Sequence, residues 1–317
     1  MAATPGEATL ARGAVGSSRP RWGFARREAM WGYLFISPWI AGFLLFTLIP
    51  MAAALVFSLT DFDLRKPDAI HFIGLRNYER LLVDHGVQSS LLTTIRYILI
   101  TVPLNLVFSL AVATLLNSPQ VAGRSAFRTL FYMPIQIPLV AATLIWAGVL
   151  NGSSGWVNQA LGAVGITGPD WIGDSGWVLV TLALIGLWSC GNMMLIFIAG
   201  LQSVPSELYD AARVDGAGRW ATFTRVTVPL ITPVIFYNVL ISLVTSFQVF
   251  IQPYVLKNGI PDDATNLFNV NLYREAFSFN QMGYASALAW VLFGVILVVT
   301  LVLFWSSRRW VYYAAER

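Results

Sequence analysis

The chain has 317 residues, of which 56% are hydrophobic and only 11% are charged. Soluble domains carry about 25% charged residues, so this composition excludes an ordinary water-soluble protein. The formal charge of +4 is too thinly spread to indicate nucleic-acid binding. A single cysteine, Cys190, excludes an intrachain disulfide and a cysteine-based metal site.

Residues 1–28 are rich in Ala, Gly, Ser and Arg and show no apolar pattern, which predicts a flexible tail. Six uninterrupted apolar stretches follow, each reaching the roughly 20 residues that cross a bilayer as a helix. These stretches are Tyr33–Phe57, Ser89–Asn117, Thr129–Leu150, Trp177–Leu201, Pro229–Leu256 and Tyr284–Ser306. The sequence therefore predicts an all-α integral membrane protein, with a six-helix domain at 29–310 and a short tail at 311–317. The first stretch is too long for a signal-peptide core and no cleavage site follows it, so we expect no cleaved signal peptide.

Basic residues concentrate in alternate connections. The amino tail, the turn around Gly123, the segment after Leu201 and the carboxyl tail hold thirteen of them, and the opposite connections hold six. Basic connections stay in the cytoplasm. We therefore expect both termini and segment 202–228 to face the cytoplasm. Of the outward loops, residues 61–88 predict a small ordered cap, and Trp156, Leu161 and Val164 predict a short helix lying on the membrane surface.

Segment 202–228 carries the most informative pattern. Pro205 suits the first turn of a helix, where its missing N–H costs nothing, and Glu207 near that end favours the helix dipole. Gly216 stands where a left-handed helix terminus requires glycine. A second short turn runs through Trp220 and Phe223 to Val228, and Pro229 opens the next span, so the segment predicts a bent helix–Gly–helix element.

Ala211 and Ala212 would give this element a smooth face on which another protein can pack closely. An amphipathic linker lying on the membrane surface is the alternative explanation of the same helical pattern.

The spacing of the whole segment favours the element that packs on another protein over the linker on the membrane surface. The segment contains Asp210-Ala211-Ala212, then Gly216 after three residues, then Val226 after nine more, and then Val228-Pro229 after one more. This run resembles the Glu-Ala-Ala signature of the inner-membrane permease subunits of binding-protein-dependent ABC importers. The resemblance implies the type I importer permease fold, and an element that docks on a cytoplasmic ATPase subunit. The residues it assigns to ATPase coupling are Glu207, Asp210, Ala211, Ala212, Asp215, Gly216, Phe223 and Pro229.

Further segments resemble the carbohydrate-type permeases, such as those for maltose and glycerol phosphate. They are Phe72–Tyr78, Phe127–Pro134, Ser246–Phe250, Tyr273–Phe277 and Gly283–Ala285. Gly259-Ile260-Pro261 departs from the Gly-Gly-Pro common in that family. The resemblance implies import of a sugar or related polar solute across the bacterial or archaeal inner membrane, with the chain embedded in the lipid bilayer.

The same resemblance implies three kinds of protein partner: an extracytoplasmic solute-binding protein, two cytoplasmic ATP-binding subunits and a second permease. Carbohydrate relatives usually pair two different permeases, and a homodimer is the alternative. No cofactor is expected on this chain, because ATP and Mg would be used by the partner subunits.

Polar residues within the spans mark a candidate substrate path. They are Gln136, Trp188, Ser189, Asn192, Ser242, Ser246 and Gln248. Ser242, Ser246 and Val249 share one helical face by their spacing. In the maltose permease that the chain resembles, matching positions help line the sugar site, and here the third is apolar. For each residue alone, hydrogen bonding between helices is the competing explanation.

Two rival functions fit the sequence less well. An ion-coupled secondary transporter would need an acidic group within the membrane, and a lipid-modifying enzyme would need a catalytic cluster at a membrane face; neither is found. Lys66 and Lys257 are the only lysines and neither follows glycine, so the chain has no phosphate-binding loop of its own. Arg96, near the outer end of a span, either extends to the interface or contacts an anionic solute or the receptor.

Overall fold

The computed structural model describes residues 22–260 and 262–312. Within these residues the regular structure is helical, apart from an isolated antiparallel bridge between Thr60 and Phe72. The all-α class predicted from the sequence is confirmed. Contacts divide the chain into two compact units, residues 1–53 and 54–317.

In its described residues, from Trp22 on, the first unit is a single apolar helix. It comprises α1 (Trp22–Phe43), the π-helical turn η1 (Leu44–Leu48) and the start of α2 (Ile49–Ser58). The run Arg26–Ser58 is long and apolar enough to cross a membrane. The helix begins at Trp22, because Ala25 to Ala29 are good helix formers that extend it. Residues 22–28 are therefore helical rather than part of the predicted flexible tail, whose residues 1–21 lie outside the described part.

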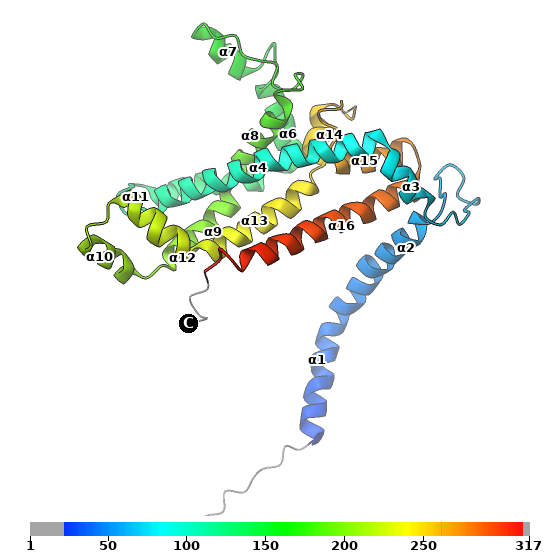
Figure 1. Ribbon diagram of the computed structural model, residues 1–317, viewed down its shortest axis with the longest axis horizontal. Coiled ribbons are helices and arrows are strands. Elements are labelled where there is room, and N and C mark those ends of the chain that lie inside the picture. The colour runs from blue at the N-terminus through cyan, green and yellow to red at the C-terminus, as the bar shows by residue number, and fades with distance from the viewer. Residues whose placement is uncertain (1–21, 261, 313–317) are drawn as a thin grey trace, which may run out of the picture. The chain divides into compact units, whose positions relative to one another are not determined.

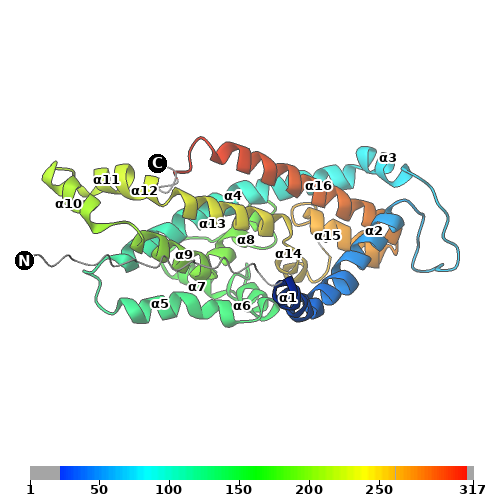
Figure 2. The same cartoon turned by 90° about the horizontal axis from the view of Figure 1, so that it is seen from below.

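The second unit is a helical bundle built around α4 (His85–Asn117). Helices α8 (Val178–Trp188), α9 (Gly191–Gln202) and α13 (Thr232–Phe247) pack against α4, and α16 (Met282–Ser307) packs against α13. Figures 1 and 2 show α4, α13 and α16 running side by side along the bundle. These helices bury the apolar side chains that form the core.

Three of the six predicted spans are bent rather than uninterrupted. The pieces Arg124–Gln136 and Leu139–Val149 meet at 102°, Val178–Trp188 and Gly191–Gln202 at 57°, and Arg219–Leu230 and Thr232–Phe247 at 68°. Within residues 22–260 and 262–312, three continuous helices are long and apolar enough to cross a membrane, or up to six spans if each bent pair is counted as one. The first pair consists of α5 (Arg124–Tyr132), the 3-10 turn η2 (Met133–Gln136) and α6 (Leu139–Val149).

Each bend has a local cause. Pro138 forces the preceding Ile137 into an extended conformation, which ends η2. Gly191 opens α9 where a Cβ atom would lie 2.5 Å from the Phe131 carbonyl oxygen, so only glycine permits this approach. Pro233 stands in the first turn of α13, where proline starts a helix but does not continue one.

The fifth span also ends earlier than predicted. Helix α13 stops at Phe247, and a separate helix, α14 (Ile251–Leu256), follows a break at Gln248 to Phe250. Within one continuous helix, the ring of Pro253 would clash with the Val249 carbonyl. The predicted span Pro229–Leu256 therefore contains the end of α12 and two further helices, α13 and α14.

The bundle has two distinct ends, each with its own buried cluster. We call one the hinge end; it holds α10 (Ser206–Val214) and α11 (Arg219–Thr222) beside a core of Met194, Phe197 and Ile231. We call the other the cap end. It holds α3 (Arg76–Val83), α15 (Phe268–Tyr273) and the π-helical turn η4 (Arg274–Ser278), beside a core that includes Val87, Phe268, Tyr284 and Leu288. The predicted short helix in the second loop is α7 (Trp156–Ala163).

Candidate functional site

The hinge element follows α9 and spans residues 205–230. Helix α10 ends at Gly216, whose φ of +74° is the left-handed conformation that the sequence predicted. The Ala217 amide donates to the Ala212 carbonyl at 2.9 Å and the Gly216 amide to the Arg213 carbonyl at 3.0 Å. These two bonds satisfy the last carbonyls of α10 and turn the chain sharply. The return arm is α11, the π-helical turn η3 (Phe223–Thr227) and α12 (Val228–Leu230).

One face of α10 anchors the element to the bundle. Tyr209 packs against the core of the hinge end, and its hydroxyl lies 3.2 Å from the Thr227 hydroxyl on the return arm. Ala212, one turn on, is buried. The two arms are therefore tied together behind the glycine.

The opposite face of α10 is exposed. Among the predicted coupling residues, Glu207, Asp210, Ala211, Asp215 and Gly216 are exposed, while Phe223 and Pro229 are half-buried. The prediction that Ala211 and Ala212 share one face for a partner is therefore wrong for Ala212, which packs inside its own chain. Consecutive residues of a helix point about 100° apart, and the anchoring side takes the second alanine.

Three apolar residues on this exposed surface were not among the coupling residues assigned from the sequence. Val214 is 88% exposed, Trp220 75% and Leu208 41%. Leu208, Ala211 and Val214 follow one another at intervals of three, which is the signal of a shared helical face. The exposed surface of the hinge element is thus apolar as well as acidic.

A cavity of about 530 Å³ opens between the helices of the bundle; its wall is mostly apolar but carries several hydroxyl and amide groups, and we call it the polar cavity. Five predicted substrate-path residues line it, namely Ser189, Asn192, Ser242, Ser246 and Gln248. The structure therefore brings together residues from the α8–α9 break and from α13, including Val249, which lies just beyond the end of α13.

Two predicted substrate-path residues lie elsewhere. Gln136 is exposed on η2. Trp188 lines a separate apolar cavity of about 550 Å³, where its ring meets Trp146 edge-on at 5.8 Å between centroids. The bend between α5 and α6 takes η2 out of line with the other lining residues.

Helix α4 supplies a third wall of the polar cavity that sequence reasoning missed. Tyr97, Thr101 and Asn105 line it, and their spacing of four residues places them on one helical face. The Thr101 hydroxyl is buried and has no hydrogen-bond partner among the described residues. A buried hydroxyl without a partner is destabilising, so this part of the wall is a polar position kept at a cost in stability.

No charged residue is among the described residues that line this cavity. Hydroxyl, amide and aromatic groups dominate its polar surface, and these bind neutral hydrogen-bonding solutes without the cost of burying an unpaired charge. The lining chemistry therefore fits an uncharged polar molecule. Arg96 lies outside this lining and is exposed on α4.

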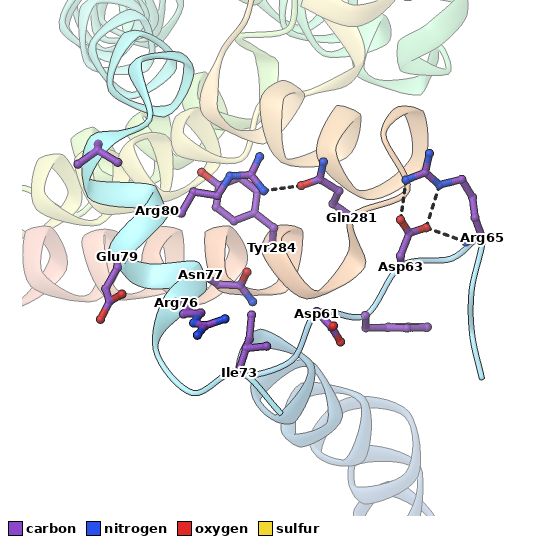
Figure 3. Close-up of a pocket in the computed structure, with 12 residues that line it drawn as sticks. Asp61, Asp63, Arg65, Ile73, Arg76, Asn77, Glu79, Arg80, Gln281 and Tyr284 are labelled. Carbon is purple, nitrogen blue, oxygen red and sulfur yellow. Dashed lines mark hydrogen bonds and ion pairs between the residues drawn. The ribbon is translucent and has the colours of Figure 1, made fainter. Parts of the chain in front are cut away.

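The cap end holds a second polar cavity, of about 710 Å³, between α3, the loop before it and the start of α16 (Figure 3). Arg65 pairs with Asp63 at 2.6 Å, and this hydrogen bond lowers the pKa of Asp63 to about 2. Arg80 extends over the ring of Tyr284 and donates to Gln281. The predicted ordered cap is present.

Glu275, on η4 behind this cavity, is half-buried, and its Oε2 has no hydrogen-bond partner among the described residues. Burial raises the pKa of its carboxyl, and the charges of Arg80 and Arg274 partly oppose that shift. The Glu275 side chain therefore remains protonated at pH values just above the ordinary pKa of glutamate.

A bundle of apolar spans that encloses a polar cavity and ends in an exposed hinge defines a membrane permease. Comparison with known proteins gives the family. Residues 105–312 match the model of the binding-protein-dependent transport system inner membrane component. The chain belongs to this family. It is thus an ABC importer permease, and the ion-coupled transporter is excluded.

Named relatives cover almost the whole chain. The probable ABC transporter permease protein YesP of Bacillus subtilis (strain 168) is 40% identical over 296 residues, which are 92% of this chain and 94% of YesP. The arabinooligosaccharides transport system permease protein AraP of the same organism is 32% identical over 273 residues, or 85% of this chain and 86% of AraP.

A solved structure shares the fold. One chain of the bacterial alginate ABC transporter, crystallised with its alginate pentasaccharide-bound periplasmic protein, aligns with a TM-score of 0.77. The alignment covers 92% of this chain and 98% of that chain, at 22% identity. The type I importer permease fold implied by the sequence resemblance is confirmed.

Proposed function

We propose that this chain is one of two membrane-spanning subunits of an ATP-driven importer for a neutral sugar or a closely related polar solute. The uncharged polar cavity carries the proposal, because its hydroxyl, amide and aromatic groups match the chemistry of a sugar. The names of relatives support it, since they include permeases for arabinooligosaccharides and lactose.

The hinge element supplies the energy coupling in this proposal. ATP and Mg bind to two cytoplasmic partner subunits, and closure of those subunits pushes on the exposed face of α10. Leu208, Val214 and Trp220 provide apolar contact area there, and the acidic Glu207, Asp210 and Asp215 provide polar contacts. The tie between Tyr209 and Thr227 passes the push to α12 and α13.

Movement of α13 reshapes the polar cavity, because Ser242, Ser246 and Gln248 line one of its walls. The permease alternates between a state open to the receptor side and a state open to the cytoplasm. In this arrangement the cap end faces outward, where a solute-binding protein delivers the solute, and the hinge end faces the cytoplasm. The excess of basic residues in the connections on the hinge side supports this orientation.

The second membrane-spanning subunit is proposed to be a different permease, as in most carbohydrate importers. A second copy of this chain would make the cavity symmetric. Mass determination of the assembly purified through a tag on this chain distinguishes the two.

Uptake into proteoliposomes tests the proposed function. The complex of this chain with its ATPase and permease partners is reconstituted, and radiolabelled neutral mono- and oligosaccharides are compared with an acidic alginate oligosaccharide. We expect uptake of a neutral sugar that requires ATP on the side of the membrane where the hinge element lies. This uptake should persist when ion gradients are collapsed. Uptake that survives ATP removal, or that is confined to the acidic sugar, would contradict the proposal.

A further inference from the structure

The cap end contains a chain of polar contacts that the transport cavity and the hinge do not use. We call it the clasp; it consists of Arg80, Gln281, Tyr284 and Asp84. Each member comes from a different part of the cap end: α3, the residue before α16, α16 itself and the residue that caps α4. The clasp therefore joins the consecutive helices α3 and α4 to α16, about 200 residues further along the chain.

The contacts of the clasp are continuous. The Arg80 guanidinium stacks on the Tyr284 ring, 3.9 Å from its centroid, and donates to the Gln281 side chain (Figure 3). The Tyr284 hydroxyl donates to Asp84 Oδ2 at 2.7 Å. Asp84 Oδ1 accepts from the Gly86 amide at 2.9 Å and so caps the first turn of α4. Tyr284, at the centre, is only 3% exposed.

Helix α3 is also held by hydrogen bonds to the end of α2 and the loop that follows it, outside the clasp. The Asn77 amide donates to the carbonyls of Ser58 and Thr60, each at 2.8 Å, and Tyr78 shares a hydrogen bond with the Ser58 hydroxyl. At Gly283 the start of α16 lies so close to the loop before α3 that a Cβ atom would be 2.2 Å from the Thr60 carbonyl. Displacement of α3 therefore moves the loop, the start of α16 and Asp84 together.

The outer surface of the cap is suited to a protein partner. Phe72 is 76% exposed, Leu75 63% and Leu82 75%, although they lie beyond the ends of the spans. Arg76 and Glu79 on the same helix are exposed and have no ion-pair partner among the described residues. Apolar side chains mixed with unpaired charges are typical of a surface that docks a folded protein.

The clasp connects this surface to the transport cavity. Asp84 caps α4, and the same continuous helix carries Tyr97 and Thr101 into the cavity wall, about 25 Å further along at 1.5 Å per residue. A helix of this length moves as one body. A shift of the capped end of α4 therefore displaces Tyr97 and Thr101 in the cavity wall.

We propose that the clasp relays docking of the solute-binding protein on the cap to α4 and α16, and that Arg80 and Tyr284 are positioning residues for this step. The inference rests on the proposed function. The receptor binds the exposed face of α3 and its loop, and the clasp turns that contact into movement of two spans. A contact of this kind sets how strongly the receptor stimulates the ATPases and leaves receptor affinity unchanged.

The test is ATP hydrolysis by the reconstituted complex, titrated with the solute-binding protein that purifies with it. Tyr284→Phe removes one hydroxyl from the clasp and keeps the ring, and Arg80→Ala removes the other end. Lys66→Ala, an exposed change on the same docking surface but outside the clasp, is the control, and it should leave the maximal stimulation unchanged whatever its effect on the half-saturating receptor concentration. We expect both clasp variants to lower the maximal stimulation about fivefold, with basal hydrolysis and the half-saturating receptor concentration unchanged.

The double variant should be no worse than Arg80→Ala alone, because both changes interrupt the same relay. Full stimulation in Tyr284→Phe and Arg80→Ala would overturn the inference. Equal losses of basal and stimulated hydrolysis would also overturn it, since they mark a tie that only stabilises the fold. If the complex carrying Arg80→Ala does not assemble, the stimulation measured for the conservative variant Tyr284→Phe is the test of the clasp. A wild-type complex that no receptor stimulates would instead contradict the proposed function.

Discussion

Thr101 is the residue through which the α4 wall of the cavity can be tested. It lines the polar cavity, and its buried hydroxyl has no partner among the described residues. Thr101→Val keeps the shape and removes the hydroxyl, so it should not destabilise the protein. We expect it to raise the half-saturating solute concentration for uptake about fivefold, the effect of losing one hydrogen bond of about 1 kcal/mol.

Thr143→Val is the matched control for this measurement. Thr143 is equally buried, but it donates to the Leu139 carbonyl within α6 and does not line the cavity. Equal uptake affinities in wild type and Thr101→Val would remove Thr101 from the solute site.

Glu275 makes a second prediction at the residue scale, on stability. Its folded-state pKa is raised by burial, so the ionised carboxylate destabilises the fold above that pKa, and the penalty disappears as pH falls below the unfolded-state value. Glu275→Gln should therefore raise the melting temperature at pH 8 by roughly 2 °C. The gain should disappear towards pH 4.

Thermal unfolding of the detergent-solubilised chain at both pH values measures this gain. Glu79→Gln, at an exposed position on α3, serves as the control and should show no pH-dependent difference. A Glu275→Gln variant that is less stable at pH 8 would show that the carboxylate is stabilised by its arginine neighbours.

The hinge is the element on which the energy coupling depends. Proline cannot adopt the φ of +74° found at Gly216, and it would remove the amide that bonds to the Arg213 carbonyl. Gly216→Pro should leave the subunit inserted and the partner ATPases active, but lower the solute transported per ATP about tenfold.

Gly218→Ala is the control for this change. Gly218 has a φ of −68° and no atom within 4 Å of an added Cβ, so alanine fits there without strain. Parallel assays of uptake and ATP hydrolysis measure the coupling ratio. An unchanged ratio in Gly216→Pro would contradict the role assigned to the bend.

Element-scale features were only partly predictable from the sequence. The bend at Gly216 follows from local chemistry, because one residue in the left-handed region requires glycine. The contact between Tyr209 and Thr227 depends on how two arms fold back on one another, so no spacing rule finds it. The burial of Ala212 depends in the same way on which side of α10 meets the core.

At the scale of the whole molecule, hydropathy predicted the six apolar stretches but not their bends. A hydropathy average is insensitive to a single break, whereas Pro138, Gly191 and Pro233 act on one or two peptide groups. The α4 wall of the cavity was missed because α4 reads as a uniform apolar span. The repeat of Tyr97, Thr101 and Asn105 at four-residue intervals shows its polar side.

The orientation of the whole chain is a further prediction. Cys190 is buried, so the native chain should react poorly with a membrane-impermeant maleimide. We expect Lys66→Cys to be labelled from outside intact cells and Arg213→Cys only after permeabilisation, because basic connections remain inside. The wild-type chain gives the background. Labelling of Arg213→Cys in intact cells would reverse the orientation.

The helix breaks at Ser189–Cys190 and at Gln248 both border the polar cavity. Helix termini leave peptide groups without intrahelical partners, and these groups cannot be removed by exchanging a side chain. A broken helix in the cavity wall therefore carries carbonyl groups whose polarity does not depend on the side chains. Related permeases can therefore differ in solute through a few hydroxyl and amide side chains, while the backbone carbonyls at these breaks stay in place.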